Sequence, residues 1–518
     1  MRKTTLALTI GALLAAAAAP AQAADLWDVY QLAVQNDPTF LQAYSNYQAT
    51  EENGAIARGG YFPNISLNGR RTVNRNNGTG TQFIPPDNST TPPSPGGFVP
   101  FESNTHGYDT VYGAQLTQAI FDWTAWSAIE QASAQQAQAE ADFQAAQQDL
   151  ILRVATAYFD VLNARDTLAA DHAAKDALSK QLEQAREKYE VGMSAITDVQ
   201  EAQAAYDQST ADEITAQQQV VTAEENLRAI TGQQVADLKE PSVDMPLRTP
   251  EPATAQQWVD QAMKQNPKLL SAQSGADAAS ANVGIQRGQH LPTLSLVLAH
   301  NRDTSSQTGT ALINQVPVPA TTPPGTISQN IAYLQLSWPI WNGGTTWARV
   351  NQAQYLYQAS LDNVKLVTRQ TEQQARTAFI GVLSGISQVE ALKQSVKSNE
   401  TSMDATETGL QVGTRTIVDV LTARQNLLKA QTGFANARYT YLKNVLTLKQ
   451  SAGILTENDV KQINVILQAA APTSDIGAGP DTAPSAGTMA APASATSPVP
   501  AAATTAAPTA TTSTPPRG

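Results

Sequence analysis

The side chains that most often carry chemistry are scarce in this sequence. It has no cysteine and only four histidines, and no two of these lie close enough along the chain to suggest a metal chelate: His106, His172, His290 and His300. A chain without cysteine forms no disulfide, thiolate zinc site or cysteine nucleophile, and it offers no leading cysteine for lipid attachment. We therefore expect no cofactor and no firm metal site.

Motifs that would indicate an enzyme are missing as well. We find no H-E-x-x-H, no G-x-S-x-G and no phosphate-binding loop. Gly78-Thr79-Gly80 lacks the third glycine of a dinucleotide-binding turn. Asn64-Ile65-Ser66 and Asn77-Gly78-Thr79 fit the glycosylation sequon, a pattern short enough to arise by chance. The sequence therefore does not predict an enzyme.

Charge and hydropathy exclude two further classes of protein. The 518 residues carry a formal net charge of −12, with a pI near 4.9. Such a chain lacks the basic surface that neutralises phosphates, so we expect no nucleic-acid partner. The mean hydropathy of −0.28 argues against a bundle of transmembrane helices.

The two ends of the chain differ from the rest. Arg2 and Lys3 precede an apolar stretch from Leu6 to Ala19 and a small-residue cleavage site, so residues 1–23 are predicted to be a signal peptide. Residues 471–518 are mostly Ala, Pro, Thr and Ser, and we interpret them as a disordered tail. Between these ends no 18 consecutive residues are apolar, so a second membrane would have to be crossed by β-strands.

The body of the chain repeats itself once. Asn36-Asp37-Pro38 recurs 229 positions later as Gln265-Asn266-Pro267. Farther along, Val191-Gly192 recurs 221 positions later as Val412-Gly413. The change of offset confines the one length difference to residues 68–114 and 297–334, where we expect a surface loop because loops tolerate such changes. We expect two structural repeats, 24–240 and 241–470.

Each repeat is predicted to contain long helices and two strands. Residues 124–190 have no Pro or Gly and are rich in helix formers, which predicts one helix about 100 Å long. The expected helices are 26–58, 124–190, 194–230, 254–287, 345–409 and 417–451. The expected strands are about 63–75, 108–120, 292–302 and 327–340. Small residues and many Gln, Asp and Glu fit a closely packed helical wall beside water, although an ordinary coiled-coil rod would also explain them.

The strands favour a membrane protein. Each is long enough to cross a bilayer, which takes roughly 9–11 tilted residues. Five of the seven tryptophans lie where strands meet the long helices: Trp123, Trp126, Trp338, Trp341 and Trp347. Indole rings prefer the headgroup zone, so these residues are predicted to form an interface belt, the alternative being core plugs at the joint.

The number of strands bears on assembly. Four strands cannot close a membrane barrel, because their open edges would be unsatisfied in lipid. Two chains would give an eight-stranded barrel filled by side chains, whereas three would give twelve strands and an interior passage. If the protein is a conduit, a homotrimer is the smallest assembly that works.

Over roughly residues 25–465 the sequence resembles the TolC family of outer-membrane efflux and type I secretion ducts. The resemblance is carried by VGTRTIVDVL at 412–421, by ANARY at 435–439 and by the first-half counterpart VGMSAITDV at 191–199. It implies a fold class of mixed all-α and transmembrane β, with a homotrimeric 12-stranded outer-membrane β-barrel continued by an α-helical periplasmic barrel. It also implies a cell outer membrane location, contact with outer-membrane lipid, a periplasmic adaptor (membrane fusion) protein and an inner-membrane pump of the RND, ABC or MFS class.

The resemblance assigns a gate to the periplasmic tip, where the helix pairs turn. Asp419 matches the family position that forms an acidic ring at the constriction, which would favour cations. The second acidic ring of some close relatives falls at Thr422, so we expect one ring and a weaker cation site. The turns themselves are the expected adaptor-docking residues: Val191, Gly192, Met193, Val412, Gly413 and Thr414.

The same resemblance assigns a latch that holds the gate. Arg415 matches the latch arginine, and Thr197 and Asp198 match its partners in the first-half turn. The aromatic latch position of those relatives is Leu410 here, so we expect one latch hydrogen bond to be missing. Taken alone, Asp198 and Asp419 also fit carboxylates that complement a helix N-terminus, and both roles can hold together.

The leading hypothesis is a passive, gated exit duct that conducts drugs, small molecules or proteins from an inner-membrane pump to the exterior. The alternative is a non-channel periplasmic coiled-coil adaptor or scaffold protein. That alternative explains the long helices but not the paired strands flanked by tryptophans.

Overall fold

The computed structural model describes residues 24–468 except 88, 90, 91, 93, 94, 236 and 242–244. The expected signal peptide, 1–23, and the expected tail, 471–518, lie outside the described residues. The described elements follow one order twice: short helices, two long strands, one very long helix and a shorter helix. The expected boundary between the repeats at 240/241 falls within the two-residue strand β3 (Glu240–Pro241), which pairs with β7 (Leu467–Gln468).

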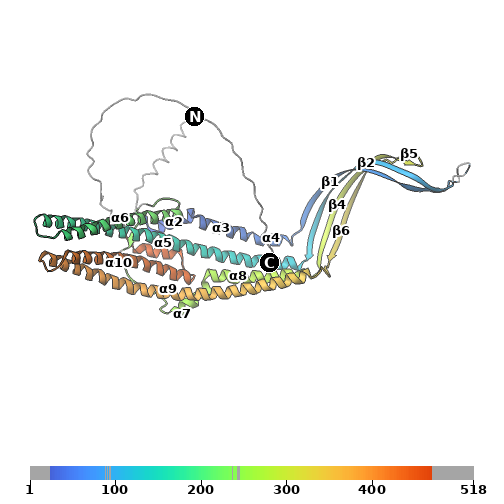
Figure 1. The fold of residues 1–518 in the computed structure, drawn as a ribbon. Helices are drawn as coiled ribbons and strands as arrows, with labels where there is room; N and C mark the ends of the chain where they lie inside the picture. Colours follow the sequence, from blue (N-terminus) through green and yellow to red (C-terminus); the bar gives the residue numbers. More distant parts are fainter. Residues whose placement is uncertain are drawn as a thin grey trace, which may run out of the picture. The chain divides into compact units, whose positions relative to one another are not determined.

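Two very long helices run the length of the helical region (Figure 1). They are α5 (Trp123–Glu190) and α9 (Thr345–Gln411). Each turns back into a shorter partner, α6 (Ile196–Thr231) and α10 (Ile417–Ser451) respectively. Because α10 also packs on α5, the two helix pairs lie side by side.

The helices that precede the strands are broken where we expected them to be continuous. In place of one helix over 26–58 there are α2 (Leu26–Asn36), α3 (Pro38–Glu51) and α4 (Asn53–Gly59). In place of 254–287 there are α7 (Ala255–Gln265) and α8 (Pro267–Gly288). Two of the breaks are at Asp37-Pro38 and Asn266-Pro267, where proline holds the preceding residue in extended conformation, ψ 114° and 118°.

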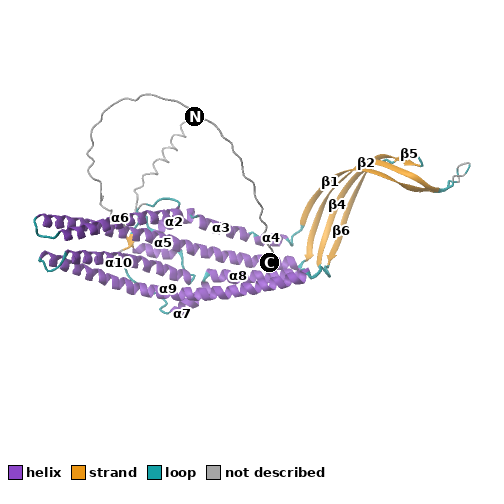
Figure 2. Ribbon diagram, viewed as in Figure 1, coloured by secondary structure: helices purple, strands orange, loops and turns teal. Residues whose placement is uncertain are grey.

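Four long antiparallel strands form a sheet at one end of the helices (Figure 2). They are β1 (Asn64–Ile84), β2 (Gly97–Phe121), β4 (Thr293–Ile313) and β6 (Thr322–Ser337), in the order β1-β2-β4-β6. The short β5 (Val316–Pro319) also pairs with β4, after a two-residue turn in which Asn314 and Gln315 have positive φ.

Most of the strands extend well beyond the residues we predicted. The predicted strand at 63–75 continues to Ile84, the one at 108–120 begins at Gly97 and the one at 292–302 reaches Ile313. The fourth begins at Thr322 and ends at Ser337, against a predicted 327–340. The prediction was too short because Gly-, Asn- and Thr-rich segments looked like loops, yet they remain in register, as Gly78 does opposite Ser103.

The main apolar core lies between the helix pairs, away from the strands. It joins α2, α5 and α10 to α11 (Glu457–Ile466), and its largest fully buried side chains include Tyr158, Phe159 and Tyr439. The Tyr158 hydroxyl donates to the Lys239 carbonyl at 2.6 Å, so this core also fixes the segment between the repeats. Among the described residues, no helix is long and apolar enough to cross a membrane.

Candidate functional site

The two faces of the sheet differ in polarity. Ile65, Leu116 and Leu298 lie opposite one another in register, and their face continues with Leu334 and Leu336 on β6. These positions lie near the helices, and all of them except half-buried Leu116 are exposed, by 40% to 70%, although they are apolar. An exposed, continuous apolar sheet face is what contact with lipid requires.

The opposite face is mostly polar and more covered. On this face the four strands carry Ser66, Gln115, Asn301, Asp303 and Gln335, with a minority of apolar residues such as Val297 and Ile331. Side chains alternate between faces along a strand, so this polarity belongs to one face and not to the strands as a whole. A sheet with lipid on one side and water on the other satisfies both faces.

The five predicted belt tryptophans all lie near the junction of strands and helices, and all are exposed, by 43% to 82%. That exposure contradicts the alternative of core plugs within the protomer. The Trp338 indole N–H donates to the His290 carbonyl at 3.2 Å, which holds one ring beside the start of the sheet. At the other border of the apolar face, Arg71 lies over the Tyr108 ring, 4.8 Å from its centroid.

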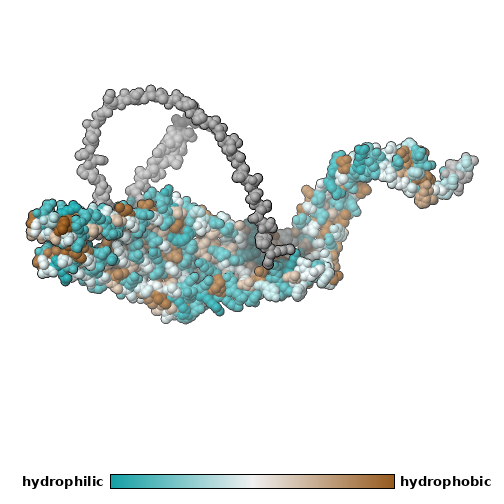
Figure 3. All heavy atoms as spheres, viewed as in Figure 1, coloured by the Kyte–Doolittle hydropathy of each residue, from teal (hydrophilic) through white to brown (hydrophobic). Residues whose placement is uncertain are grey.

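The far ends of the helix pairs form two glycine turns. Gly192 and Gly413 have φ of 76° and 77°, a backbone conformation that glycine adopts without strain. Around them Val191, Met193 and Val412 are exposed, and Thr414 donates its hydroxyl to the Gly409 carbonyl. Figure 3 shows hydrophobic residues gathered at these free ends and along the strands.

Asp419 completes the capping box of the helix that follows the second turn, whose N-cap residue is Thr416. Its Oδ2 accepts hydrogen bonds from the Thr416 backbone N–H and hydroxyl, at 2.9 and 3.0 Å, and its own N–H donates to the Thr416 hydroxyl oxygen. These hydrogen bonds, with a smaller contribution from the charge of Arg415, lower the pKa of Asp419. Asp419 is therefore ionised at neutral pH, as an acidic ring would require.

The predicted latch residues are near the turns but do not meet one another in the protomer. Asp198 accepts from the Ser194 hydroxyl at 2.8 Å. Within the described part of the chain, the Arg415 guanidinium makes no hydrogen bond or ion pair, and its aliphatic stem covers Gly409. Exposed Thr197 and Thr422 and half-buried Leu410 take no part in a side-chain bond among the described residues. The latch stays a prediction.

Ile417 is a tip residue to which we assigned no role from the sequence. It is only 9% exposed and packs among Leu182, Ala185, Val199 and Ala202 of the other helix pair. It therefore holds the two tips together. The one signal in the sequence was an isoleucine at the first position of a helix. That signal does not distinguish buried Ile417 from its repeat equivalent Ile196, which occupies the same helix position and is 48% exposed.

A buried carboxylate ties α5 to α6 farther from the tip. Glu213 accepts from Lys175 Nζ and lies 2.6 Å from His172 Nδ1. Hydrogen bonds from Lys175 and then His172 lower the pKa of Glu213. Among the described residues, no group of three or more His, Cys, Asp or Glu could hold a metal ion.

Sheet and tips together define a channel-forming outer-membrane protein with a long helical extension. The chain belongs to the outer membrane efflux protein family, whose sequence profile matches residues 29–233 and 258–454. It is an outer-membrane exit channel of the efflux or type I secretion kind, and its helices extend into the periplasm.

Individual relatives are similar over almost their whole length. Outer membrane protein TolC of Escherichia coli (strain K12) is 33% identical over 487 residues, which cover 93% of this chain and 92% of that protein. Alkaline protease secretion protein AprF of Pseudomonas aeruginosa is 28% identical over 456 residues, covering 88% and 89%. The Campylobacter jejuni CmeC outer membrane channel has the same fold, with a TM-score of 0.65 at 17% identity over 85% of this chain and 89% of that one.

Proposed function

We propose that three copies of this chain assemble into one passive duct, closed at the periplasmic tips and opened by partner proteins. The observation that carries the proposal is the single sheet with one apolar face. Within the described residues, β1 and β6 each pair on one side only, so both edges need another strand. Three copies would supply twelve strands around a passage.

The helical region supports the same assembly. On α9 the side chains of Tyr355 and Leu356 are exposed, and on α3 those of Leu41 and Tyr44 are exposed. α9 packs on α8 and α10, whereas α3 and α6 pack on α5, so these apolar side chains lie on the outer helices of the protomer. Burial against neighbouring copies would remove them from water.

We further propose that Asp419 forms the acidic ring of the gate, with Arg415, Thr197 and Asp198 as its latch. Thr422 leaves the gate with one ring, and Leu410 leaves the latch without an aromatic partner. The five tryptophans would lie in the membrane interface, where indole rings are favoured. This ring would favour cations over anions, because its carboxylate is ionised at neutral pH.

Partners are proposed from the tips and from the relatives. The exposed apolar turns suit a periplasmic adaptor, which would connect the duct to an inner-membrane pump. AprF and PrtF are named for protease secretion, and BepC for efflux. Cargo would therefore be drugs, small molecules or proteins selected by the pump, with no catalytic step in this chain. A non-channel adaptor or scaffold is not favoured, because it leaves the apolar sheet face unexplained.

Single-channel recording in a planar bilayer tests the gate. Asp419→Ala removes the ring charge, so we expect higher conductance and weaker block by divalent cations. Thr422→Ala, one helical turn along, is the matched control and should leave both unchanged. Conductance and block that do not respond to Asp419→Ala would refute the gate assignment, and a monomer in mild detergent would refute the assembly.

A further inference from the structure

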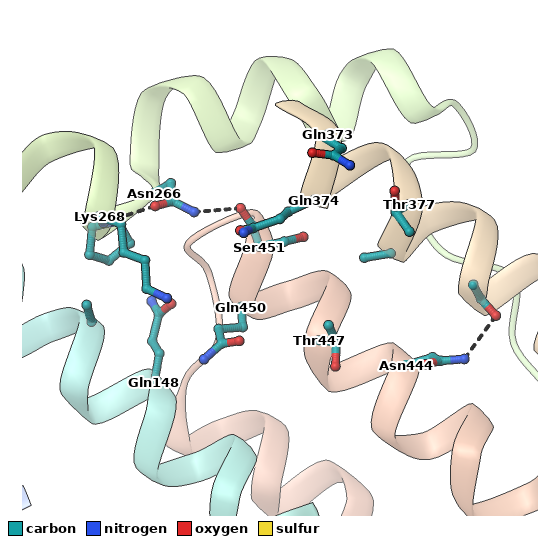
Figure 4. Close-up of a pocket in the computed structure, with 14 residues that line it drawn as sticks. Gln148, Asn266, Lys268, Gln373, Gln374, Thr377, Asn444, Thr447, Gln450 and Ser451 are labelled. Carbon is teal, nitrogen blue, oxygen red and sulfur yellow. Dashed lines mark hydrogen bonds between the residues drawn. The ribbon is translucent and has the colours of Figure 1, made fainter. Parts of the chain in front are cut away.

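A polar cavity of about 620 Å³ lies where α8 begins and α10 ends, between α5 and α9 (Figure 4). We call it the closed joint. Gln148 forms part of its α5 wall and donates Nε2–H to the Gly453 carbonyl at 3.0 Å. Across the cavity, Asn266 donates to the Ser451 carbonyl at 2.8 Å. The closed joint is thus lined on each of these sides by helices of one chain.

The first repeat contains an incomplete version of this cavity, of about 280 Å³, which we call the open joint. Each of its lining residues has an equivalent 221 positions later that lines the closed joint. The lining residues of the open joint are Leu152, Arg153, Thr156, Ala157, Asp160, Ala223, Asn226 and Ile230. The two cavities are therefore repeat equivalents of different completeness.

The open joint lacks one wall. In the closed joint that wall is Ala145 and Gln148 on α5, and their equivalents 221 positions later are Leu366 and Arg369 on α9. Both equivalents are exposed, Leu366 by 53%, and Arg369 makes no hydrogen bond or ion pair with any described residue. The residues that would complete the open joint are thus present, but on an outer helix of the protomer.

The two joints also differ in charge. At the open joint, Asp37 is buried and bonds Arg153 at 2.7 Å, and Arg153 also bonds Asp149 at 2.8 Å. This arrangement has two carboxylates and one guanidinium, which is an excess of one negative charge. The equivalents in the second repeat are the neutral amides of Asn266, Gln374 and Gln370.

The missing wall supplies the opposite charge. Neutral Gln148 borders the closed joint, whose one charged lining residue, Lys268, is exposed. Its equivalent Arg369 is cationic, so a wall that carries Arg369 would balance the excess negative charge at the open joint. Charge therefore changes together at the three positions of the cluster and at the wall residue. Two further lining positions differ in charge, Asp160 with Gly381 and Lys268 with Thr39, but Asp160 is already paired with Lys443 at 2.9 Å and adds no unbalanced charge.

A second contact, between α5 and α8, also has repeat-equivalent residues that do not touch each other within the protomer. A Cβ built on Gly284 lies 3.3 Å from the Ser127 Cβ, so these backbones approach closely within the protomer. The equivalents of this pair are Ala55 and Ala348, and both are exposed. The outer surfaces of α4 and α9 thus carry the two halves of a contact that the protomer makes internally.

We propose that Leu366 and Arg369 of a second copy close the open joint, with the Arg369 guanidinium beside the Asp37–Arg153–Asp149 cluster. The joint between neighbouring copies is then held by an ionic contact, whereas the equivalent closed joint within one copy is held by the amides of Gln148 and Asn266. This inference rests on the proposed assembly of copies. It adds how neighbouring copies align along their helices and which residues each copy contributes to the contact.

Disulfide formation tests the register, since the chain has no cysteine of its own. Ala55→Cys with Ala348→Cys should give covalent trimers on a non-reducing gel, because the equivalent internal pair is within disulfide range. Ala55→Cys with Ala359→Cys, three turns farther along α9, is the mismatched control and should not crosslink. Intact trimers that do not crosslink through Ala55→Cys and Ala348→Cys would overturn the register but leave the assembly standing, and monomers would overturn the assembly itself.

Charge variants test the role of Arg369. Arg369→Glu should lower the temperature at which trimers dissociate on a semi-native gel, and Arg369→Gln should lower it less. Raising the salt concentration should narrow the difference between wild type and variants, because ionic contacts are screened. Lys365→Gln, on the same helix but paired with Asp362 in its own chain, is the control and should change nothing. If Arg369→Glu dissociates at the wild-type temperature in low salt, the ionic contact is refuted.

Discussion

Removal of the Ile417 side chain should loosen the closed state of the channel. This residue joins the two helix-pair tips, and opening of the proposed gate would require those tips to separate. The change to test is Ile417→Ala, which leaves Thr416 and the helix cap at Asp419 in place. We expect the open state to become more populated without loss of assembly.

The magnitude can be worked out from the burial of Ile417. The side chain is 9% exposed, and truncation to alanine removes three carbon atoms at about 0.8 kcal/mol each. A cavity would add to this loss, but the alanine neighbours Ala185 and Ala202 lie at a free tip that can close in. A net loss of ~2 kcal/mol in the stability of the closed state, for each Ile417 contact removed, would shift the closed-to-open ratio roughly 30-fold.

Single-channel recording of purified trimers is the assay, with the fraction of time spent in the high-conductance state as the readout. Val418→Ala is the matched control, because it removes apolar atoms from the neighbouring, largely exposed position. We expect a large rise in open time for Ile417→Ala and little for Val418→Ala. The reasoning fails if the two variants open equally often while both remain assembled.

Three further predictions concern stability, read as the temperature of trimer dissociation. Gly413 and Gly453 both have positive φ, but an added Cβ would meet nothing within 4 Å at Gly413, whereas at Gly453 it would collide with a backbone carbonyl of α7. Gly413→Ala should therefore lower the stability by ~1 kcal/mol, and Gly453→Ala should lower it clearly more. Equal shifts of the dissociation temperature would contradict the steric account. Asp37→Asn keeps the helix cap but loses the ion pair with Arg153, and Asp37→Ala loses both, so the alanine variant should be less stable than the asparagine variant by ~1 kcal/mol. Burial raises the pKa of Asp37, but hydrogen bonds from Arg153 and the backbone outweigh burial and lower the pKa overall. The greater stability of wild type over Asp37→Asn is therefore present at neutral pH and should vanish as the pH falls through that lowered pKa. Glu213→Gln should destabilise the α5–α6 pair at neutral pH and be harmless below the lowered pKa of Glu213, and a penalty that persists in acid would show that packing, not charge, is responsible.

The long helices were accessible from the sequence because their limits are set locally. The expected helix at 124–190 and the observed α5 differ by one residue, since Pro and Gly are absent from the interior and Gly192 follows the end. The helix breaks before Pro38 and Pro267 could also have been found, because proline restricts the residue before it. The same motifs mark the repeat, but a comparison of the two repeats alone does not reveal the break, because both repeats contain it.

Strand length and side-chain partners could not be obtained in the same way. Residues such as Asn77 and Gly78 have low strand propensity, and pairing with β2 keeps them extended. Partners far apart in the chain, such as Ile417 with Leu182, depend on how the helix pairs pack. The difference between the open and the closed joint requires both sequence and structure to be recognised. The sequence contains the charges of Asp37 and Arg369, and the structure shows which of the two cavities lacks a wall.

The length of the strands has a consequence for the cell surface. The apolar face of β1 ends near Val73, but the strand continues to Ile84, a further ~35 Å at about 3.3 Å per residue. Because β2 pairs with it throughout, this extension is a hydrogen-bonded ribbon and not a slack loop. Its residues therefore project beyond the bilayer-spanning part, and a short peptide tag inserted among them would reach the outside of the cell without disturbing that part.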